Sequence, residues 1–160
     1  MTERRASSTP AAGVEKLLRR LEAARASMME SLKDCEPSLF RAEAADGESL
    51  KRWLERTADD VNLYYGRLAA RALNLPQPPC IQKADFSSLR EAMVSLQVAH
   101  RRFSNLLHDL SPEDLKREAA DPELGTYTMR QILELATAHY TRRSQQITSA
   151  RATHSEAARE

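Results

Sequence analysis

Residues 126–147 read Thr-Tyr-Thr-Met-Arg-Gln-Ile-Leu-Glu-Leu-Ala-Thr-Ala-His-Tyr-Thr-Arg-Arg-Ser-Gln-Gln-Ile, a stretch that predicts a long amphipathic helix. Thr128 and Gln131 mark its start with the spacing of a capping box, in which each side chain satisfies a free backbone N–H. The apolar stripe that follows contains two ionisable residues, His139 and Arg143. A charged group on a core-facing stripe is costly unless it is paired, bound or hydrated. These two residues are therefore the first candidates for a functional site.

Composition and charge exclude several classes of partner. The 160 residues are enough for one domain, and 24 basic against 23 acidic residues give a formal charge of +1. Because no net field attracts the chain to nucleic acid or to an anionic membrane, we expect neither partner. The sequence has no secretory signal and no apolar run long enough to span a bilayer, which predicts a cytoplasmic protein.

Four amphipathic segments predict an all-α fold, a four-helix bundle with one short extra helix before the last long helix. Ser49 is the predicted N-cap of the second helix, and Ser88 with Glu91 gives a capping box for the third. Ser111-Pro112 begins the short extra helix. No strand-like alternation is visible. The long segments are residues 14–32, 49–74, 88–110 and 128–150.

The domain organisation follows from where polar residues gather. We expect a disordered N-terminal tail over residues 1–12, a single bundle domain over residues 13–150 and a frayed polar C-terminus over residues 151–160. Leu39 and Phe40, in the loop after the first helix, are expected to lean onto the bundle.

Common catalytic motifs are absent from the sequence. It contains no Gly-rich phosphate loop, no Gly-x-Ser-x-Gly, no His-Glu-x-x-His and no Cys-x-x-Cys. Cys35 and Cys80 are too few for a disulfide framework and are interpreted as idle thiols. For His100, on the stripe of the third helix, we expect a neutral imidazole that is hydrogen-bonded to a neighbour.

Three motifs carry a resemblance to a known family. Residues 121–147 resemble the last helix, with its lead-in, of the DinB-like (damage-inducible) four-helix-bundle superfamily, a bacterial stress-related family. Ser111-Pro112-Glu113-Asp114-Leu115 and the Gly47-x-Ser49 entry to the second helix are similar to the same pattern. The resemblance implies a zinc or nickel ion held by one histidine of the second helix and by a His-x-x-x-His on the last. Some members are thiol transferases or thiol-dependent isomerases.

The chain departs from that pattern at two of the three metal-ligand positions. His139 matches the first histidine of the last helix, but Arg143 stands at the second, and aligning Gly47-x-Ser49 places Arg56 at the position on the second helix. A guanidinium is always charged and has no lone pair to give to a metal. The resemblance therefore implies a degenerate metal site, and we expect no cofactor. A zinc or nickel site formed by a shifted set, such as Asp60 with His139, is the alternative.

The candidate pocket consists of Arg56, Asp60, His139 and Arg143, and three interpretations of it stay open. In the first, the arginines and His139 converge on an anionic ligand. In the second, Asp60 and Asp59 neutralise the arginines, since Arg56 and Asp60 are four residues apart and could pair. Salt bridges would then fill the pocket of a structural or interaction protein. The third is a metal-dependent thiol transferase or hydrolase-like enzyme.

The predicted function is a DinB-like bundle that has lost its metal site. Such a protein would bind a small ligand, anionic in the first interpretation, or a protein partner. A homodimer is compatible with this function. We expect the chain not to be a metal-dependent transferase, and its sequence favours a binding protein over an enzyme.

Overall fold

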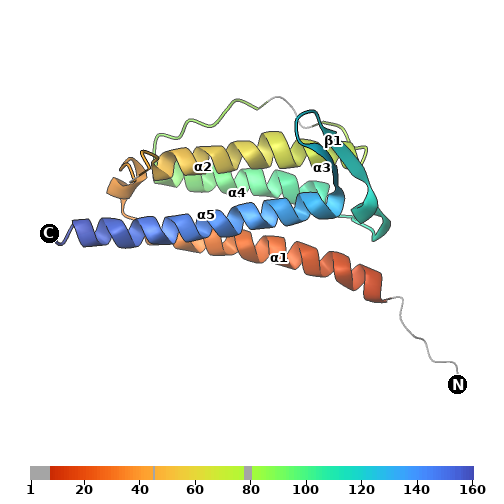
Figure 1. The fold of residues 1–160 in the computed structure, drawn as a ribbon, viewed down its shortest axis with the longest axis horizontal. Coiled ribbons are helices and arrows are strands. Elements are labelled where there is room, and N and C mark those ends of the chain that lie inside the picture. The colour runs from red at the N-terminus through yellow and green to blue at the C-terminus, as the bar shows by residue number, and fades with distance from the viewer. Residues whose placement is uncertain (1–7, 45, 78–80) are drawn as a thin grey trace, which may run out of the picture.

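Four long helices make up the protein in the computed structural model, which describes residues 8–44, 46–77 and 81–160 (Figure 1). Helix α1 packs along α5, while the second helix lies against both α4 and α5. The predicted all-α four-helix bundle is confirmed. The long elements are α1 (Ser8–Lys33), the second helix formed by α2 (Leu50–Asp59), η2 (Asp60–Tyr65) and α3 (Gly66–Ala72), α4 (Leu89–Leu106) and α5 (Met129–Ala157).

The two helices at the chain ends are longer than predicted. Helix α1 begins at Ser8 rather than at residue 14, and Pro10 falls in its first turn, where a missing N–H costs no helical hydrogen bond. Helix α5 continues to Ala157, through most of the expected frayed terminus. Residues 1–7 lie outside the described residues, so the predicted tail stays a prediction there.

The caps that the sequence predicts are present. The Thr128 hydroxyl accepts from the N–H of Gln131 (3.2 Å), and the Gln131 side chain accepts from the N–H of Thr128 (2.9 Å), which completes the capping box of α5. Ser49 accepts from the N–H of Arg52 at 3.2 Å. Ser88 caps α4, although the Glu91 carboxylate accepts from the N–H of Ser87 rather than of Ser88.

The middle of the second helix is a π-helix, η2. The wider turn shows at Gly66, whose N–H donates to the carbonyl of Val61, five residues back. A Cβ at Gly66 would lie 2.9 Å from that carbonyl oxygen. The sequence predicts an uninterrupted helix here, because the apolar spacing alone does not register one extra residue in a single turn.

A short β-hairpin corrects the expectation that no strand is present. Strand β1 (Glu118–Asp121) pairs antiparallel with β2 (Gly125–Thr128), and the 3-10 turn η3 (Glu113–Lys116) precedes it at the position of the predicted extra helix. Gly125 has a φ of +96°, a backbone conformation that favours glycine. Because β2 ends at Thr128, the hairpin leads directly into the cap of α5.

The apolar stripes meet in one core. Leu39 and Phe40, in the 3-10 turn η1 (Pro37–Phe40), belong to this core as predicted, and so does Cys35 at the end of α1. Cys80 lies outside the described residues. Among the described residues, no helix combines the length and the apolar character that crossing a bilayer requires.

Replacing Gly66 by alanine tests the π-helix. Alanine normally stabilises a helix relative to glycine, but here its Cβ would meet the Val61 carbonyl, so we expect Gly66→Ala to lower the free energy of unfolding by about 1–3 kcal/mol. The matched control is Gly13→Ala in α1, where nothing lies within 4 Å of the added Cβ, and it should stabilise by up to about 1 kcal/mol. Urea unfolding of both variants measures the two changes in the free energy of unfolding. If both variants are stabilised equally, the expected clash at Gly66 is contradicted.

Candidate functional site

The structure brings three of the four predicted site residues into one cavity. Asp60, at the start of η2, and His139 and Arg143, one helical turn apart on α5, line a space of about 320 Å³. Arg142 and Gln146 complete its lining. The cavity lies where α5 crosses the second helix, and the predicted fourth member, Arg56, does not line it.

The hydroxyl of Thr57, on α2, connects the residues of α5. Its Oγ1 donates to the carbonyl oxygen of Trp53 (2.9 Å) and accepts from Nε of Arg143 (3.0 Å). Nε2 of His139 lies 3.1 Å from the same oxygen. Thr57 is fully buried, so these partners satisfy a polar group that would otherwise be costly inside the bundle.

This network assigns the proton on His139. A hydroxyl has one hydrogen, and the Trp53 carbonyl can only accept, so the Thr57 hydrogen goes to Trp53. Nε2 of His139 must then donate to Thr57, which leaves the lone pair of the neutral ring on Nδ1. Nδ1 faces the hydroxyl of Tyr65 at 3.5 Å and Oδ2 of Asp60 at 3.6 Å.

Burial decides the protonation of these groups. Burial, reinforced by the positive charges of Arg143 and Arg142, lowers the pKa of His139 to about 4, so the imidazole is neutral at pH 7. Burial raises the pKa of Tyr65 to about 12, which keeps its hydroxyl a donor toward Nδ1. Burial likewise raises the pKa of Asp60 above its usual range, against the opposing effect of the Arg143 charge.

Arg143 is held by neutral oxygens rather than by an acid. In addition to the bond from Nε to Thr57, its Nη1 donates to Oε1 of Gln146 at 2.8 Å. Within the described part of the chain, no ion pair involves Arg143 or Arg142. Burial lowers the pKa of Arg143, which nevertheless stays a cation at neutral pH. A half-buried guanidinium is thus left without a carboxylate in contact.

Among the described residues, neither aspartate forms a direct ion pair with Arg143, although the Asp60 carboxylate still acts on the Arg143 charge and raises its pKa. Oδ1 of Asp59 accepts from the N–H of Ala84 at 2.9 Å and so anchors the loop that follows α3. Asp60 approaches His139 rather than Arg143.

Arg56 and Asp60 also do not pair with each other. Nη2 of Arg56 binds Oε1 of Glu48 at 2.7 Å, on the loop before α2, and the Arg56 side chain is half exposed. Adjacent residues of a helix point about 100° apart, and here it is Thr57 that faces His139. The alignment through Gly47-x-Ser49 is thus one residue away from the residue that contacts His139.

Sequence reasoning missed four residues that line the cavity or contact His139 or Arg143: Thr57, Tyr65, Arg142 and Gln146. Thr57 carries a usable signal, because it is a polar residue on the apolar stripe of α2. The sequence gives no signal for Arg142 and Gln146, because both are ordinary polar residues at the border of the apolar stripe of α5.

His100 behaves as predicted. Its Nδ1 lies 3.0 Å from the hydroxyl of Tyr140, and its Nε2 lies 3.0 Å from Oε2 of Glu22 on α1. Burial lowers the pKa of His100, which favours the neutral ring even beside the Glu22 carboxylate. His100 therefore joins α4 to α1 and α5 and lies outside the candidate cavity.

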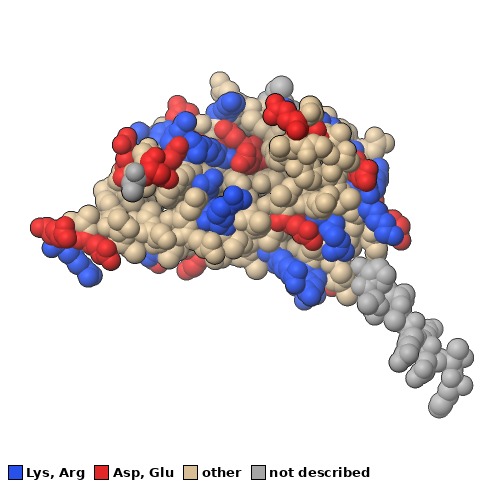
Figure 2. Space-filling model, in the orientation of Figure 1, with Lys and Arg blue, Asp and Glu red and all other residues tan. Residues whose placement is uncertain are grey.

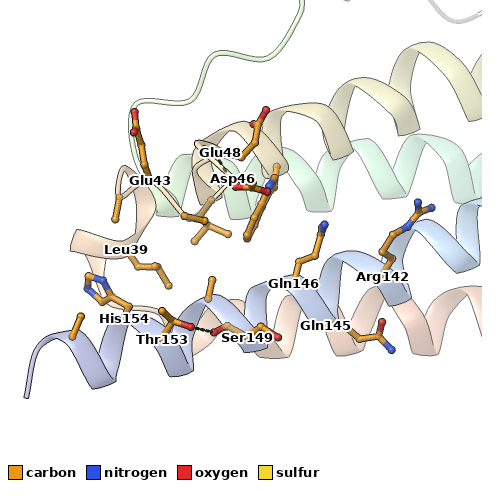
Figure 3. A pocket seen from close by; sticks show the side chains of 16 residues that line it. Leu39, Glu43, Asp46, Glu48, Arg142, Gln145, Gln146, Ser149, Thr153 and His154 are labelled. Carbon is orange, nitrogen blue, oxygen red and sulfur yellow. Dashed lines mark hydrogen bonds between the residues drawn. The ribbon is translucent and has the colours of Figure 1, made fainter.

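A second, larger hollow adjoins the cavity. It has a volume of about 610 Å³ and lies between the loop that precedes α2 and the C-terminal half of α5 (Figure 3). Arg142 and Gln146 line both spaces. Basic and acidic side chains are interspersed over the face drawn in Figure 2.

Comparison with known proteins identifies the fold. No protein-family model and no curated protein sequence matches the chain. Among solved structures, YfiT from Bacillus subtilis superposes with a TM-score of 0.69 at 19% sequence identity, over 94% of this chain and 91% of that one. The fold is YfiT-like. YfiT itself is described as a probable metal-dependent hydrolase with an unusual four-helix bundle topology. At 19% identity the likeness extends to the fold alone.

Few of the side chains that line the cavity could ligate a metal ion. His139 offers one lone pair, at Nδ1, and Asp60 offers a carboxylate, but Arg142 and Arg143 repel a dication. The described residues contain no group of three His, Cys, Asp or Glu side chains that could hold a metal. Structural and catalytic zinc sites in proteins use at least three such ligands.

The buried neutral histidine predicts a dependence of stability on pH. The unfolded chain holds the His139 proton up to its ordinary pKa of 6.5, whereas the folded protein releases it above about 4. The unfolded state therefore binds more protons in this window, and the free energy of unfolding should fall by up to about 3 kcal/mol as the pH drops from 6.5 to 4.

The measurement is urea unfolding between pH 4 and pH 7 for the parent and for His139→Gln. Glutamine can still donate to Thr57 but does not titrate, so its curve should be flatter by the His139 contribution. Imidazole ¹⁵N shifts at pH 6 should report a neutral ring protonated on Nε2. Parallel pH curves, or a charged ring at pH 6, would contradict the assignment.

Proposed function

We propose that the chain is a binding protein for a small oxyanion, which it holds in the cavity between the second helix and α5. The observation that carries this proposal is Arg143, a half-buried guanidinium fixed by Thr57 and Gln146 and left without a carboxylate in contact among the described residues. Arginine in such a position binds carboxylate or phosphate oxygens through charge-assisted hydrogen bonds.

The charges around the cavity favour a monoanion. Two guanidinium groups, of Arg142 and Arg143, stand against one carboxylate, of Asp60, while His139 is neutral. One positive charge is in excess. A carboxylate would balance it, whereas a dianion would add repulsion from Asp60.

The neighbours of Arg143 hold it ready for a ligand. Thr57 occupies Nε and Gln146 occupies Nη1, so the plane of the guanidinium is fixed before an anion arrives. A side chain ordered in advance loses less entropy on binding. His139 supports this arrangement through Thr57, since its own N–H uses the second lone pair of the hydroxyl.

The metal-dependent enzyme is the second candidate, and the YfiT-like fold is the observation in its favour. The side chains that could ligate a metal argue against an enzyme of this kind. Nδ1 of His139 and the Asp60 carboxylate provide only two ligands, and the cations Arg142 and Arg143 lie beside them. A homodimer and a protein partner stay predictions.

Anion binding predicts a thermal shift. At ten times its Kd, acetate should add about 1.4 kcal/mol to the free energy of unfolding, which corresponds to an increase of about 3–6 °C in Tm. Arg143→Gln should abolish the shift. Arg143→Lys, which keeps the charge but loses the planar fork, should retain only part of it.

The matched control is Arg130→Gln, which removes an exposed arginine from the same helix, α5, away from the cavity. Its shift should equal that of the parent at constant ionic strength. If acetate and phosphate both leave Tm unchanged, or if Arg130→Gln loses the shift as fully as Arg143→Gln, the anion site is disproved.

Metal analysis tests the second candidate. Protein purified without chelator should contain far less than one equivalent of zinc or nickel, and added Zn²⁺ or Ni²⁺ should not raise Tm. Near-stoichiometric metal that disappears in His139→Ala would overturn the oxyanion proposal in favour of an unorthodox metal site.

A further inference from the structure

We propose that the ligand is an amphipathic monocarboxylate whose apolar tail lies in the groove beside the cavity. The groove is the hollow of about 610 Å³ between the loop of residues 37–49 and the C-terminal half of α5 (Figure 3). This inference rests on the proposed oxyanion site and adds the chemical class of the ligand.

Apolar atoms provide most of the exposed surface of the groove, although polar side chains such as Gln145, Ser149 and Thr153 also line it. Leu39 comes from η1, Leu50 and Trp53 come from the start of α2, and Ala150 and Ala157 come from α5. Its volume falls within the range of roughly 300–1,000 Å³ that is typical of small-molecule sites. An apolar tail placed there would remove both its own surface and that of the groove from water.

One end of the groove opens toward the anion site. Arg142 and Gln146 line both the groove and the cavity that contains Arg143, so the two spaces adjoin at these side chains. Figure 3 places Arg142 at one end of the groove and Glu43 and His154 near the other. A ligand that lies along the groove therefore has its carboxylate beside the arginines and its tail pointing toward η1.

The far end of the groove does not suit a second anion. Glu43 lies near the far end of the groove, and Asp46 and Glu48 line it between Glu43 and Arg142 (Figure 3). Nε2 of His154, at this end, is 2.9 Å from the Ser38 hydroxyl and 3.7 Å from Glu36. A second carboxylate would meet these acids, so the groove selects a monoacid over a diacid of the same length.

The single tryptophan provides a direct measurement. Trp53 lines the groove and is the only tryptophan of the chain, so its emission reports on that space alone. With the full chain we expect acetate to raise Tm without changing the Trp53 emission. Hexanoate, octanoate and decanoate should change the emission, with a Kd that falls about three- to fourfold per added methylene. Decanedioate should bind at least tenfold more weakly than decanoate.

Blocking the groove separates the tail from the carboxylate. Ala150→Phe should fill the groove, weaken decanoate to the level of acetate and leave the Tm shift by acetate intact. Ala138→Phe, on an exposed position of α5 that does not line the groove, is the matched control and should bind decanoate as the parent does. The chain-length series on the parent protein stands even if Ala150→Phe folds poorly.

The outcomes distinguish this inference from the proposed function. An acetate shift that depends on Arg143, together with a Kd that is independent of chain length, would overturn the tail site and leave the anion site standing. Absence of any anion binding would overturn both. If decanol binds as tightly as decanoate, or if a dimer detected by sedimentation dissociates in Ala150→Phe, the groove belongs to another occupant and the inference fails.

Discussion

The hydroxyl oxygen of Thr57 is the point on which the polar interior of the bundle depends. It is a hydrogen-bond partner of the Trp53 carbonyl, the His139 imidazole and the Arg143 guanidinium, and it is fully buried. A buried donor left without a partner costs about 1–3 kcal/mol of stability. By accepting hydrogen bonds from His139 and Arg143, one hydroxyl avoids this cost for two ionisable side chains on the stripe of α5. It also fixes which nitrogen of His139 carries the proton, and thereby what faces the cavity.

The geometry around Thr57 depends in turn on how the second helix is built. The π-helix begins at Asp60, three residues after Thr57, and places Asp60 and Tyr65 on the Nδ1 side of His139. Insertions of this kind re-aim side chains and occur often at functional sites. The loop after α3 is fastened to the same helix, through Asp59 to Ala84 and through Glu55 to Phe86.

Much of the fold could be predicted because its causes are local. Helical spacing gave the four long helices, and the caps at Ser49 and Thr128 lie where side-chain chemistry requires them. The strands of the hairpin have four residues each, too few for an alternating pattern to be recognised. The length of α5 beyond residue 150 was missed because its last turns have no apolar stripe of their own and lie against the loop of residues 37–49.

The candidate site was predicted correctly on α5, but on the second helix only Asp60 was predicted correctly. His139 and Arg143 interrupt an apolar stripe, which a sequence reveals, whereas their partner on the second helix depends on the rotation of that helix to within one residue. An alignment that is wrong by one residue places Arg56 where Thr57 lies. The predicted partner of His139 is then a cation that binds Glu48 rather than a buried hydroxyl. The groove was not predictable, because it forms only when two distant segments meet.

Arg143 gives the cavity a cationic hydrogen-bond donor at a position where a histidine could ligate a metal ion. Residues i and i+4 share one face of a helix, so two imidazoles at 139 and 143 would point their lone pairs at one ion. A guanidinium at the second position replaces a lone pair by donors and a positive charge, while the facing Thr57 supplies an acceptor that orients them. Fold and ligand charge are thus set by separate residues, which is why likeness of fold does not carry over the chemistry.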